Sequence, residues 1–436
     1  MSKGTRREFI KTGAGAVGAG LALPVFNRTA FGTTIVKELL DDSVGNGNVL
    51  VIVELAGGDD GLNLIVPLKQ YGTYASLRTR IAIPQAQVLP LYGAATNQGQ
   101  PTMGLTPNFS ALKPVFDAGK IAVIQSAHYP NPNLSHDSSR RNYYTGVPSA
   151  NLALNGTGWI GRHSALFGDK TNALDTVGIG GVSKTLYAGG AKAAGINADG
   201  NGNPTGYSFS ATNTGDRTNQ INAAKVIDSS ATQKPYLDLW EQATVDAISG
   251  SDIVAAAAAS YQGQPPTPYG TNSFAYGLRL IAKLIASTNP NLGTRVYYIS
   301  IGGFDTHANQ TTDQPTLLQR VSSALKSFYD DLVAHNAGDR VVVMIWSEFG
   351  RRVADNASSG TDHGTLNNMF VIGNPVKGGV YGPDPDLLNL SGGNLKWDPT
   401  KGTIDFRSVY AELITKWLGG DPVPVLNGSF PQLGFL

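Results

Sequence analysis

Cysteine is absent from the sequence. Its absence excludes disulfide bonds, thiolate-bound zinc, iron–sulfur clusters and a cysteine nucleophile together. Any metal ion must therefore be bound by nitrogen and oxygen atoms of His, Asp, Glu or hydroxyl side chains. The 436 residues include only 6 histidines, so the positions of these histidines are informative about a site.

Charged residues are few and almost evenly divided in sign. Lys and Arg number 33 and Asp and Glu 32, which gives a net charge of +1, and 15% of all residues are charged. The blocks of Lys and Arg that neutralise phosphates are missing, so we expect no nucleic-acid partner. Low charge together with many Gly, Asn, Ser and Thr residues favours an exported protein instead.

Long apolar runs are also lacking. A membrane-spanning helix needs about 20 apolar residues, and no segment approaches that length, so we expect no membrane span in the mature form. Arg6-Arg7, followed by a Gly- and Ala-rich apolar run over 12–26, is typical of a twin-arginine signal peptide. We predict that residues 1–32 are this signal, cleaved near 30–33, and that the folded protein is exported to a periplasmic or extracellular location. A G-x-G-x-x-G spacing at 13–18 lacks a preceding strand and predicts no dinucleotide cofactor.

Apolar runs later in the chain predict buried strands of a parallel sheet. The four clearest runs, rich in β-branched residues and bounded by turn residues, cover 49–55, 120–126, 295–301 and 340–346. A fifth strand is expected over 368–373, and helices over 107–118, 314–336 and 408–418. This alternation predicts an α/β fold for residues 33–436, with a doubly wound, mostly parallel sheet.

The middle of the chain differs in composition. Residues 191–222 are dominated by Gly, Asn, Thr, Ser and Ala and cannot form a core of their own. Helical patterns return over 236–248 and 273–287, on either side of a Pro-rich connection at 262–268. We therefore expect a helical and loop-rich cap inserted near 150–290.

Polar residues gather after the predicted strands, at the edge where open parallel sheets bind ligands. They are Asp59, Asp60, His128, Ser135, His136, Asp137, Asp305, His307, Ser347, Glu348, Arg351, Arg352, Asp362 and His363. Four of the 6 histidines belong to this set. Carboxylates and imidazoles at such positions are the ligand types that a divalent metal needs.

Each of these residues also has a purely structural interpretation. The alternatives are a turn at Asp59-Asp60-Gly61, polar caps or backbone-bonded histidines at Asp305-Thr306-His307 and Asp362-His363, and an ion pair between Glu348 and Arg351 or Arg352. We expect the two remaining histidines, His163 and His335, to be structural. His335 falls near the end of a predicted helix, where a cation is favourable.

Ser135 follows two prolines, at a position where a helix can begin. A helix N-terminus favours a phosphate or sulfate group, and a hydroxyl activated there by a metal can act as a nucleophile, with Arg140 or Arg141 binding the anion. The alternative is that Ser135 only caps the helix. A Ser-His-Asp hydrolase fits less well, because no G-x-S-x-G elbow is present and Ser135, His136 and Asp137 are too close along the chain to form a relay.

Several motifs together resemble one family. They are the twin-arginine start and the segments ELAGGDDGLN at 54–63, NLSH at 133–136, GGFDTH at 302–307, WSEFGR at 346–351, DHG at 362–364 and DFRS at 405–408. On these motifs, nearly the whole chain resembles the exported bacterial domain of unknown function 1501 family. It is similar, more distantly, to the alkaline phosphatase and sulfatase superfamily.

The superfamily resemblance implies a doubly wound sheet with a two-metal site at the carboxyl ends of its strands. The roles that it implies are Asp59 or Asp60 as the first ligand, Ser135 as the nucleophile, Asp305 and His307 as a ligand pair, and His363 as the last ligand. At the fourth strand the chain departs from that pattern, because Ser347-Glu348-Phe349 stands where the superfamily has an Asp-His pair. Glu348 is the remaining candidate ligand there.

We therefore expect an exported, metal-dependent hydrolase that acts on phosphate or sulfate esters of a small molecule or a polymer. The expected cofactor is a divalent metal, either Zn, Ca, Mg or Mn. The predicted metal ligands are Asp59, Asp60, Asp305, His307, Glu348, Asp362 and His363, and the predicted catalytic residues are Ser135, Arg140 and Arg351.

Two alternatives stay open. A catalytically degenerate protein of the same fold would serve as an exported binding or assembly protein, with a protein partner or a polysaccharide; the missing Asp-His pair and the low-charge cap favour this interpretation. A carbohydrate-directed enzyme would instead use Glu348 and Asp305 as paired carboxylates, a hypothesis that the separation of the two carboxyl groups decides.

Overall fold

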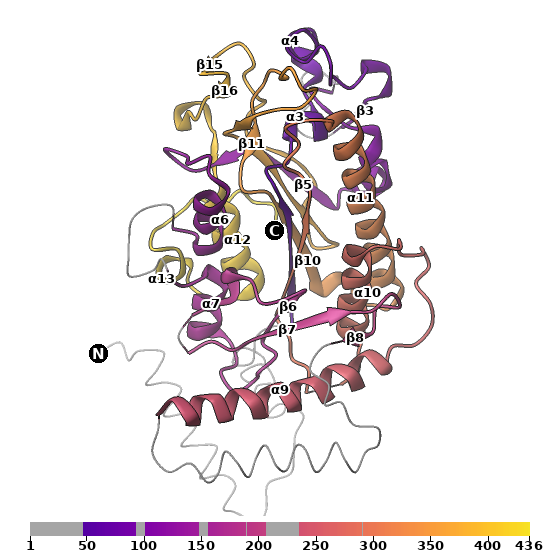
Figure 1. Ribbon diagram of the computed structural model, residues 1–436, viewed down its shortest axis with the longest axis vertical. Helices are drawn as coiled ribbons and strands as arrows, with labels where there is room; N and C mark the ends of the chain where they lie inside the picture. Colours follow the sequence, from indigo (N-terminus) through magenta and orange to yellow (C-terminus); the bar gives the residue numbers. More distant parts are fainter. Residues whose placement is uncertain (1–46, 93–100, 148–155, 189, 206–234, 290) are drawn as a thin grey trace, which may run out of the picture. The chain divides into compact units, whose positions relative to one another are not determined.

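Strand β1 (Val49–Ala56) lies in the interior of a large mixed sheet in the computed structural model of the chain (Figure 1). The structure describes residues 47–92, 101–147, 156–188, 190–205, 235–289 and 291–436. The predicted signal peptide lies outside the described residues. Residues 47–436 form one compact unit, and the account below concerns this unit.

The sheet has the strand order β14-β5-β13-β10-β1-β9-β6-β7-β8, with β17 also paired to β5. Its strands are β5 (Ile121–His128), β6 (Thr176–Ile179), β7 (Ala193–Ala198), β8 (Pro204–Thr205), β9 (Val296–Gly302), β10 (Val341–Trp346), β13 (Asn367–Ile372), β14 (Gly379–Tyr381) and β17 (Ile404–Asp405). β1 pairs in parallel with both β9 and β10. β13 runs antiparallel between β10 and β5, and β8 is antiparallel to β7, so the sheet is mixed but mostly parallel.

Helices cover both faces of this sheet (Figure 1). α10 (Ser273–Ile285) and α11 (Gln310–Ala334) lie on one face, and α6 (His136–Thr145), α7 (Trp159–Phe167), α12 (Phe406–Glu412) and α13 (Pro422–Leu426) lie on the other. Side chains of β1 contribute to the cores on both faces of the sheet, because successive side chains of a strand point to opposite faces. Val51 and Val53 belong to the core under α10 and α11, whereas Leu50 and Ile52 belong to the core under α6 and α12. The predicted doubly wound α/β fold is therefore confirmed.

The five predicted strands correspond to β1, β5, β9, β10 and β13. The predicted helix at 107–118 is irregular, a 3-10 turn over Pro107–Leu112 followed by the short helix α5 (Lys113–Asp117), because Pro114 occupies the point where the two meet. The predicted helix at 408–418 is α12 followed by a π-helical turn over Leu413–Leu418. The long predicted helix at 314–336 is α11.

The stretch 150–290 contributes directly to the sheet as well as containing helices. β6 and β7 extend the sheet beyond β9, and α10 packs on its face, so these elements belong to the sheet domain rather than to a separate layer. α9 (Pro235–Ala259) is the other long helix of this stretch. Much of the Gly- and Asn-rich run, residues 206–234, lies outside the described residues.

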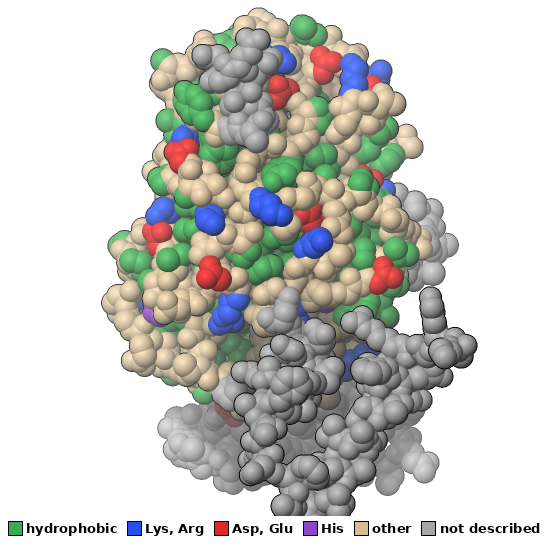
Figure 2. All heavy atoms as spheres, turned by 180° about the vertical axis from the view of Figure 1, so that it is seen from behind, with side chains coloured by type: hydrophobic (Ala, Val, Ile, Leu, Met, Phe, Trp, Pro, Cys, Tyr) green, Lys and Arg blue, Asp and Glu red, His purple; other side chains and the backbone are tan. Residues whose placement is uncertain are grey.

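Short elements complete the described chain. They are α3 (Gly61–Leu64), α4 (Tyr71–Leu77), β2 (Ile65–Val66), β3 (Leu89–Pro90), β4 (Gly104–Leu105), β11 (Gly350–Arg351), β12 (His363–Gly364), β15 (Leu390–Ser391) and β16 (Asn394–Leu395), with 3-10 turns at Leu68–Gln70, Gln85–Gln87, Lys184–Leu186, Gly338–Arg340 and Pro399–Lys401. No helix in the described ranges has both the length and the apolar character needed to cross a bilayer. Figure 2 shows charged side chains scattered over one face of the molecule, with neither sign gathered into a block.

Candidate metal centre

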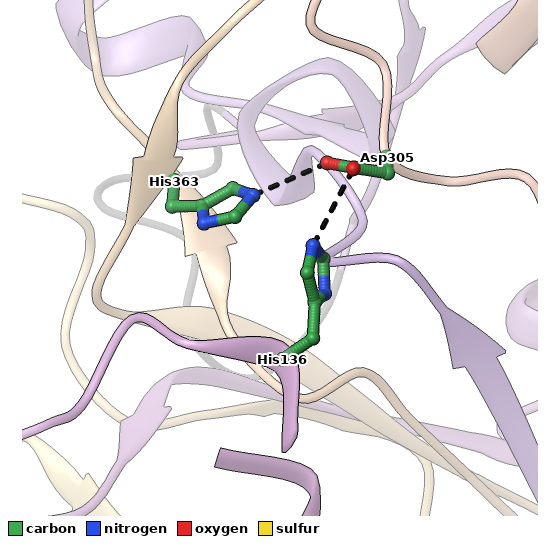
Figure 3. Close-up of side chains that lie close together, drawn as sticks. All are labelled: His136, Asp305 and His363. Carbon is green, nitrogen blue, oxygen red and sulfur yellow. Dashed lines mark hydrogen bonds and ion pairs between the residues drawn. The ribbon is translucent and has the colours of Figure 1, made fainter. Parts of the chain in front are cut away.

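Segments that follow three strands of the sheet bring imidazole and carboxylate groups together. His136 begins α6 after β5, Asp305 follows β9, and His363 lies in β12, a two-residue strand paired with β11. One ligand atom from each of the three residues lies within 4.8 Å of the others. In Figure 3 both imidazole rings point toward the Asp305 carboxylate from different segments of the chain.

The distances within this His136–Asp305–His363 cluster are those of direct contact. His136 Nε2 lies 3.4 Å from Asp305 Oδ2, and His363 Nε2 lies 3.2 Å from Asp305 Oδ1. Two ligands bound about 2.0–2.1 Å from a tetrahedral zinc ion would lie roughly 3.3 Å apart. The spacing of these nitrogen and oxygen atoms therefore fits a single divalent ion.

The other ring nitrogen of each histidine is fixed by an acceptor. His363 Nδ1 lies 2.8 Å from the carbonyl oxygen of Leu134, and His136 Nδ1 lies 2.9 Å from Glu348 Oε1. A carbonyl or carboxylate oxygen can only accept, so each Nδ1 carries the proton. When neutral, both rings therefore present the unprotonated Nε2 to Asp305, which is the arrangement seen around metal-bound histidines.

His307 joins the same group of atoms. Its Nε2 lies 2.9 Å from His363 Nε2 and 3.1 Å from Asp305 Oδ1, while its Nδ1 lies 3.5 Å from Asp362 Oδ1. Asp362 is half exposed and also accepts from Asn356 Nδ2 at 3.3 Å, so it contacts His307 from the far side. His307 is thus a fourth candidate ligand, and Asp362 contacts the imidazole of that ligand.

The electrostatics of the cluster favour an ionised Asp305 beside a neutral His363 ring. Burial acts to raise the pKa of Asp305, but the hydrogen bond from Arg351, the contact with His363 and the Arg351 charge lower it to about 2. Burial is also the largest influence on His363, and it lowers the pKa of that ring despite its bonds to Leu134 and Asp305. For His136 the hydrogen bond to Glu348 dominates and raises the pKa. Near neutral pH the His363 ring is therefore neutral beside an ionised carboxylate, and its Nδ1 proton is directed at the Leu134 carbonyl.

Arg351 binds Asp305 from the buried side of the cluster. Its side chain is fully buried, and its Nη2 donates to Asp305 Oδ1 at 2.7 Å. The same guanidinium donates to the carbonyls of Gly57, Gly58, Phe304 and Thr361. Arg351 thereby ties together the loops after β1 and β9 and the segment leading to β12. These bonds leave little donor capacity for the anion-binding role expected from the sequence.

Glu348 is buried and hydrogen-bonded on both oxygens. Its carboxylate accepts from the Gly57 N–H at 3.0 and 3.1 Å and from Ser347 Oγ at 3.2 Å, besides contacting His136. Burial acts to raise the pKa of Glu348, but the hydrogen bond with His136 and further backbone hydrogen bonds outweigh it, so the pKa lies below its usual value. In this structure Glu348 orients an imidazole ligand instead of pointing at Asp305 itself.

One imidazole lies between the two carboxylates that the sequence offered as a glycosidase pair. His136 contacts Glu348 through Nδ1 and Asp305 through Nε2. Paired carboxylates of glycosidases flank the scissile bond, and here the ring occupies the space between them. The geometry therefore gives no support to that alternative.

Asp59 and Asp60 have different surroundings although they are adjacent. Asp60 caps α3 and forms a buried ion pair with Arg78, with Asp60 Oδ2 2.5 Å from Arg78 Nη1. Asp59 Oδ1 accepts from Gln314 Nε2 at 3.3 Å, and Ser347 Oγ accepts from the Asp59 N–H. Burial, followed by the charge of Asp60, raises the pKa of Asp59 to about 8. Neither carboxylate is part of the three-residue cluster.

Ser135 immediately precedes α6, the helix that begins with His136, and Arg140 lies within this helix. Ser135 is the exposed N-cap residue of this 10-residue helix, and its hydroxyl makes no capping hydrogen bond. It directly precedes His136. Arg140 Nε donates to Glu54 Oε1 at 2.6 Å, and Glu54 is buried and also binds the hydroxyls of Tyr144 and Tyr298. Arg140 therefore neutralises a buried carboxylate, while a third of its side chain stays exposed.

The structure thus brings Asp305, His307 and His363 into contact, with Asp362 beside them. Asp59, Asp60 and Glu348 are buried, and their carboxylates bind neighbouring side chains and backbone groups. The ligands predicted from the sequence do not include His136, because only Ser135 of the NLSH segment is predicted to have a role. The available signal was its position, an imidazole at the start of a helix that follows a sheet strand, on the same edge as the other ligands.

Comparisons with known proteins agree with the resemblance noted in the sequence. Residues 208–389 match the sequence model of a family described as "Protein of unknown function (DUF1501)". The match covers less than half of the chain. It includes Asp305, His307, Glu348 and His363, and so most of the cluster. A search of curated proteins gives no match for the chain.

Solved structures of low sequence identity also match. The C-terminal periplasmic domain of EcEptC from Escherichia coli, in complex with Zn, is 9% identical with a TM-score of 0.35, covering 75% of this chain and 73% of that one. The lipoteichoic acid synthase LtaP from Listeria monocytogenes is 9% identical with a TM-score of 0.33, covering 76% and 67%. An alkaline phosphatase from the Antarctic bacterium TAB5 is 12% identical with a TM-score of 0.30, covering 78% and 95%.

Proposed function

We propose that the protein is a hydrolase of phosphate or sulfate esters that depends on a divalent metal held by His136, Asp305 and His363, with His307 as a further ligand. The observation that carries the proposal is the direction of the two rings. Both are fixed through Nδ1, so that Nε2 of each faces a carboxylate oxygen at 3.2–3.4 Å. Nitrogen lone pairs that face an anion repel it, and a divalent cation bound between them would remove this repulsion.

The donor set suits zinc best among the expected metals, because imidazole nitrogen and carboxylate oxygen are its common ligands, whereas Ca²⁺ and Mg²⁺ prefer oxygen alone. A bound divalent ion would supply Lewis-acid polarisation of the ester and favour the ionised form of a nearby hydroxyl. Within the chain, Glu348 and the Leu134 carbonyl hold the two rings in orientation. Arg351 holds Asp305 and keeps it ionised.

Ser135 is the proposed nucleophile. Its hydroxyl is exposed, makes no capping bond, and adjoins a candidate ligand at the N-terminus of α6. The free N–H groups of that helix end and its positive dipole favour the negative charge of a phosphate or sulfate group. Arg140, a third exposed and one turn along the same helix, is the cation available to offset charge on the transferred group. Arg351 acts as a positioning residue.

The reaction would take place outside the cytoplasm, since the twin arginines at Arg6-Arg7 and the apolar run after them support export of the folded protein. The substrate would be a small-molecule or polymeric ester. The alternative remains a catalytically degenerate protein of the same fold that binds a partner or polysaccharide, which the test below separates from the hydrolase.

The test is metal analysis of the purified protein followed by an assay on 4-nitrophenyl phosphate and 4-nitrophenyl sulfate after reloading with Zn²⁺, Mn²⁺ or Ca²⁺. We expect about one equivalent of metal or more, turnover of one ester, and loss of both in His136→Ala and His363→Ala. His335→Ala, at the end of α11, is the matched histidine control and should keep both.

Ser135→Ala should bind metal normally but lose turnover, whereas Ser138→Ala, one turn along α6, should be as active as the wild type. Metal binding without turnover of either ester would favour the degenerate binding protein. Absence of metal from the folded protein under all reloading conditions would reject the proposed centre itself.

A further inference from the structure

A cavity lies apart from the His136–Asp305–His363 cluster, and no residue of the cluster lines it. It has a volume of about 360 Å³, within the range of small-ligand sites. Its walls come from the 3-10 turn at Leu68–Gln70, the end of β5, and the loops between β14 and β17. Gln70 anchors this wall, since its side chain donates to the Pro385 carbonyl and accepts from the Leu387 N–H.

A buried amide at the end of β5 lacks a partner beside this cavity. Gln125 is 2% exposed, and its Nε2 has no hydrogen-bond partner among the residues that the structure describes. Gln125 lines a small hollow of about 20 Å³ that shares Ser126, Leu366 and Leu395 with the larger cavity. A hollow of that size holds about one oxygen atom of water or of a ligand. An unsatisfied buried donor needs an explanation, because it costs about 1–3 kcal/mol.

The local backbone is built to place this amide. Met369 of β13 pairs with Ile124 and Asn367 with Ala127, so β5 carries one extra residue between them. Ser126 lies in this bulge with φ of 50°, in the left-handed region that a non-glycine residue rarely adopts. Bulges often re-aim side chains beside functional sites. Here the bulge brings both Gln125 and Ser126 to the cavities.

The larger cavity combines an apolar floor with a rim of donors and acceptors. Leu366, Leu395 and Pro383 supply apolar surface. The lining also includes three lysines and three aspartates, whose charges sum to zero, and two neutral polar residues: Lys69, Lys396, Lys401, Asp384, Asp386, Asp398, Asn389 and Thr403. Lys401 already pairs with Asp386 at 3.3 Å, whereas Lys69 and Lys396 make no ion pair among the described residues.

We propose that this cavity binds one neutral carbohydrate unit. A sugar ring has an apolar C–H face and a rim of hydroxyls that both donate and accept, which matches an apolar floor ringed by carboxylates, amines and amides. A rim without net charge gives no advantage to an anionic ligand. A hydroxyl oxygen entering the small hollow would satisfy Gln125 Nε2. The proposal does not depend on the metal centre.

The test is saturation-transfer difference NMR on the full chain with maltose and cellobiose at millimolar concentrations, in the presence of a chelator. We expect saturation transfer to at least one disaccharide from the wild type. Lys396→Ala and Asn389→Ala, both at the rim, should weaken binding about tenfold. Lys170→Ala, an exposed lysine outside the cavity, is the matched control and should bind like the wild type.

Three outcomes would overturn the proposal: no transfer to either disaccharide from folded wild-type protein, transfer that the two rim variants leave unchanged, or preferential binding of glycine or inorganic sulfate in competition. Thermal unfolding of each variant confirms that a loss of binding is not a loss of fold. Hydrolase activity of the reloaded enzyme is a separate readout, so failure of the carbohydrate site and failure of the metal centre are distinguishable.

Discussion

His136 Nδ1 lies 2.9 Å from Glu348 Oε1, and this contact joins the start of α6 to the loop after β10. Glu348 is among the ligands expected from the sequence and His136 is not, although His136 contacts both Glu348 and Asp305 in the structure. The carboxylate is buried and bonded to backbone, and the imidazole faces Asp305. In the proposed metal centre, Glu348 is therefore a positioning residue that would act through His136.

Glu348→Ala should weaken metal binding about 10–100-fold, because a lost partner for Nδ1 frees the ring and lowers its basicity. Glu348→Gln should lie between this variant and the wild type, since an amide oxygen still accepts from Nδ1. Competition with a chromogenic chelator measures the dissociation constant. Glu412→Gln is the control, because Glu412 is also a buried carboxylate that accepts backbone N–H groups, near the C-terminus. Equal affinities in all four proteins would contradict the positioning role.

Asp59 and Asp60 are adjacent buried carboxylates that should respond in opposite ways to the same substitution. Asp59→Asn should raise the free energy of unfolding of the metal-free protein by at least about 1 kcal/mol at pH 8, because burial and the charge of Asp60 raise the pKa of Asp59 to about 8. The destabilisation caused by Asp59 is absent below its ordinary pKa of 3.8, grows as pH rises above that value, and levels off above about 8. Urea unfolding at several pH values should show a gain that increases with pH.

Asp60→Asn should instead destabilise the protein by about 3–5 kcal/mol, because it leaves the buried Arg78 guanidinium without its carboxylate partner. A pH-independent loss of stability in Asp59→Asn would contradict the first expectation. Metal affinity provides a second readout. Lower metal affinity in Asp59→Asn would identify Asp59 as a ligand, and unchanged affinity would leave it a buried acid beside the site.

Most of the sheet could be predicted because its strands are continuous apolar runs that only a doubly covered sheet can bury. β1 and β10 are of this kind. The antiparallel direction of β13 could not be predicted, since its NNMFVI run has the same pattern in either direction. β6 was not predicted because TVGI is only four residues long, and β7 was not predicted because AAGINA is mostly Ala and Gly with a single β-branched residue.

The candidate site could be predicted by position but not by role. Strand ends identified Asp305, His307 and His363 because parallel strands direct their carboxyl ends to one edge. Which side chain faces the centre depends on rotamers and on partners distant in sequence. Arg351 illustrates this point, because the carbonyls that it binds come from Gly57, Gly58, Phe304 and Thr361, which no local pattern connects.

Arg351→Lys should reduce the free energy of unfolding by at least about 2 kcal/mol and abolish turnover. A lysine ammonium offers three donors at one point and cannot reach carbonyls spread around a planar guanidinium. Arg352→Lys is the control at the next position, where the side chain is half exposed and lies 3.9 Å from Asp362; its stability should change by no more than about 0.5 kcal/mol. Urea unfolding and the ester assay measure the two effects. Wild-type stability in Arg351→Lys would show that the loops do not depend on this guanidinium.

His335, at the C-terminal end of α11, should make the stability of the protein depend on pH. Both ring nitrogens face acceptors, since Nδ1 lies 2.8 Å from the Asp331 carbonyl and 3.0 Å from Asp331 Oδ1, and Nε2 lies 2.8 Å from the Gln262 carbonyl. Burial lowers the pKa of His335, but these contacts outweigh it and raise the pKa above 6.5. A raised pKa gives stabilisation that is complete below the unfolded value and is lost as pH rises through the folded value. The stability difference between wild type and His335→Gln should therefore be larger at about pH 5.5 than at about pH 8.5.

His163→Gln is the comparison, because burial lowers the pKa of His163 to about 4. The stability difference between wild type and His163→Gln should therefore not shrink over that pH range. A difference for His335 that is flat or grows with pH would show that the ring is bound as the neutral form.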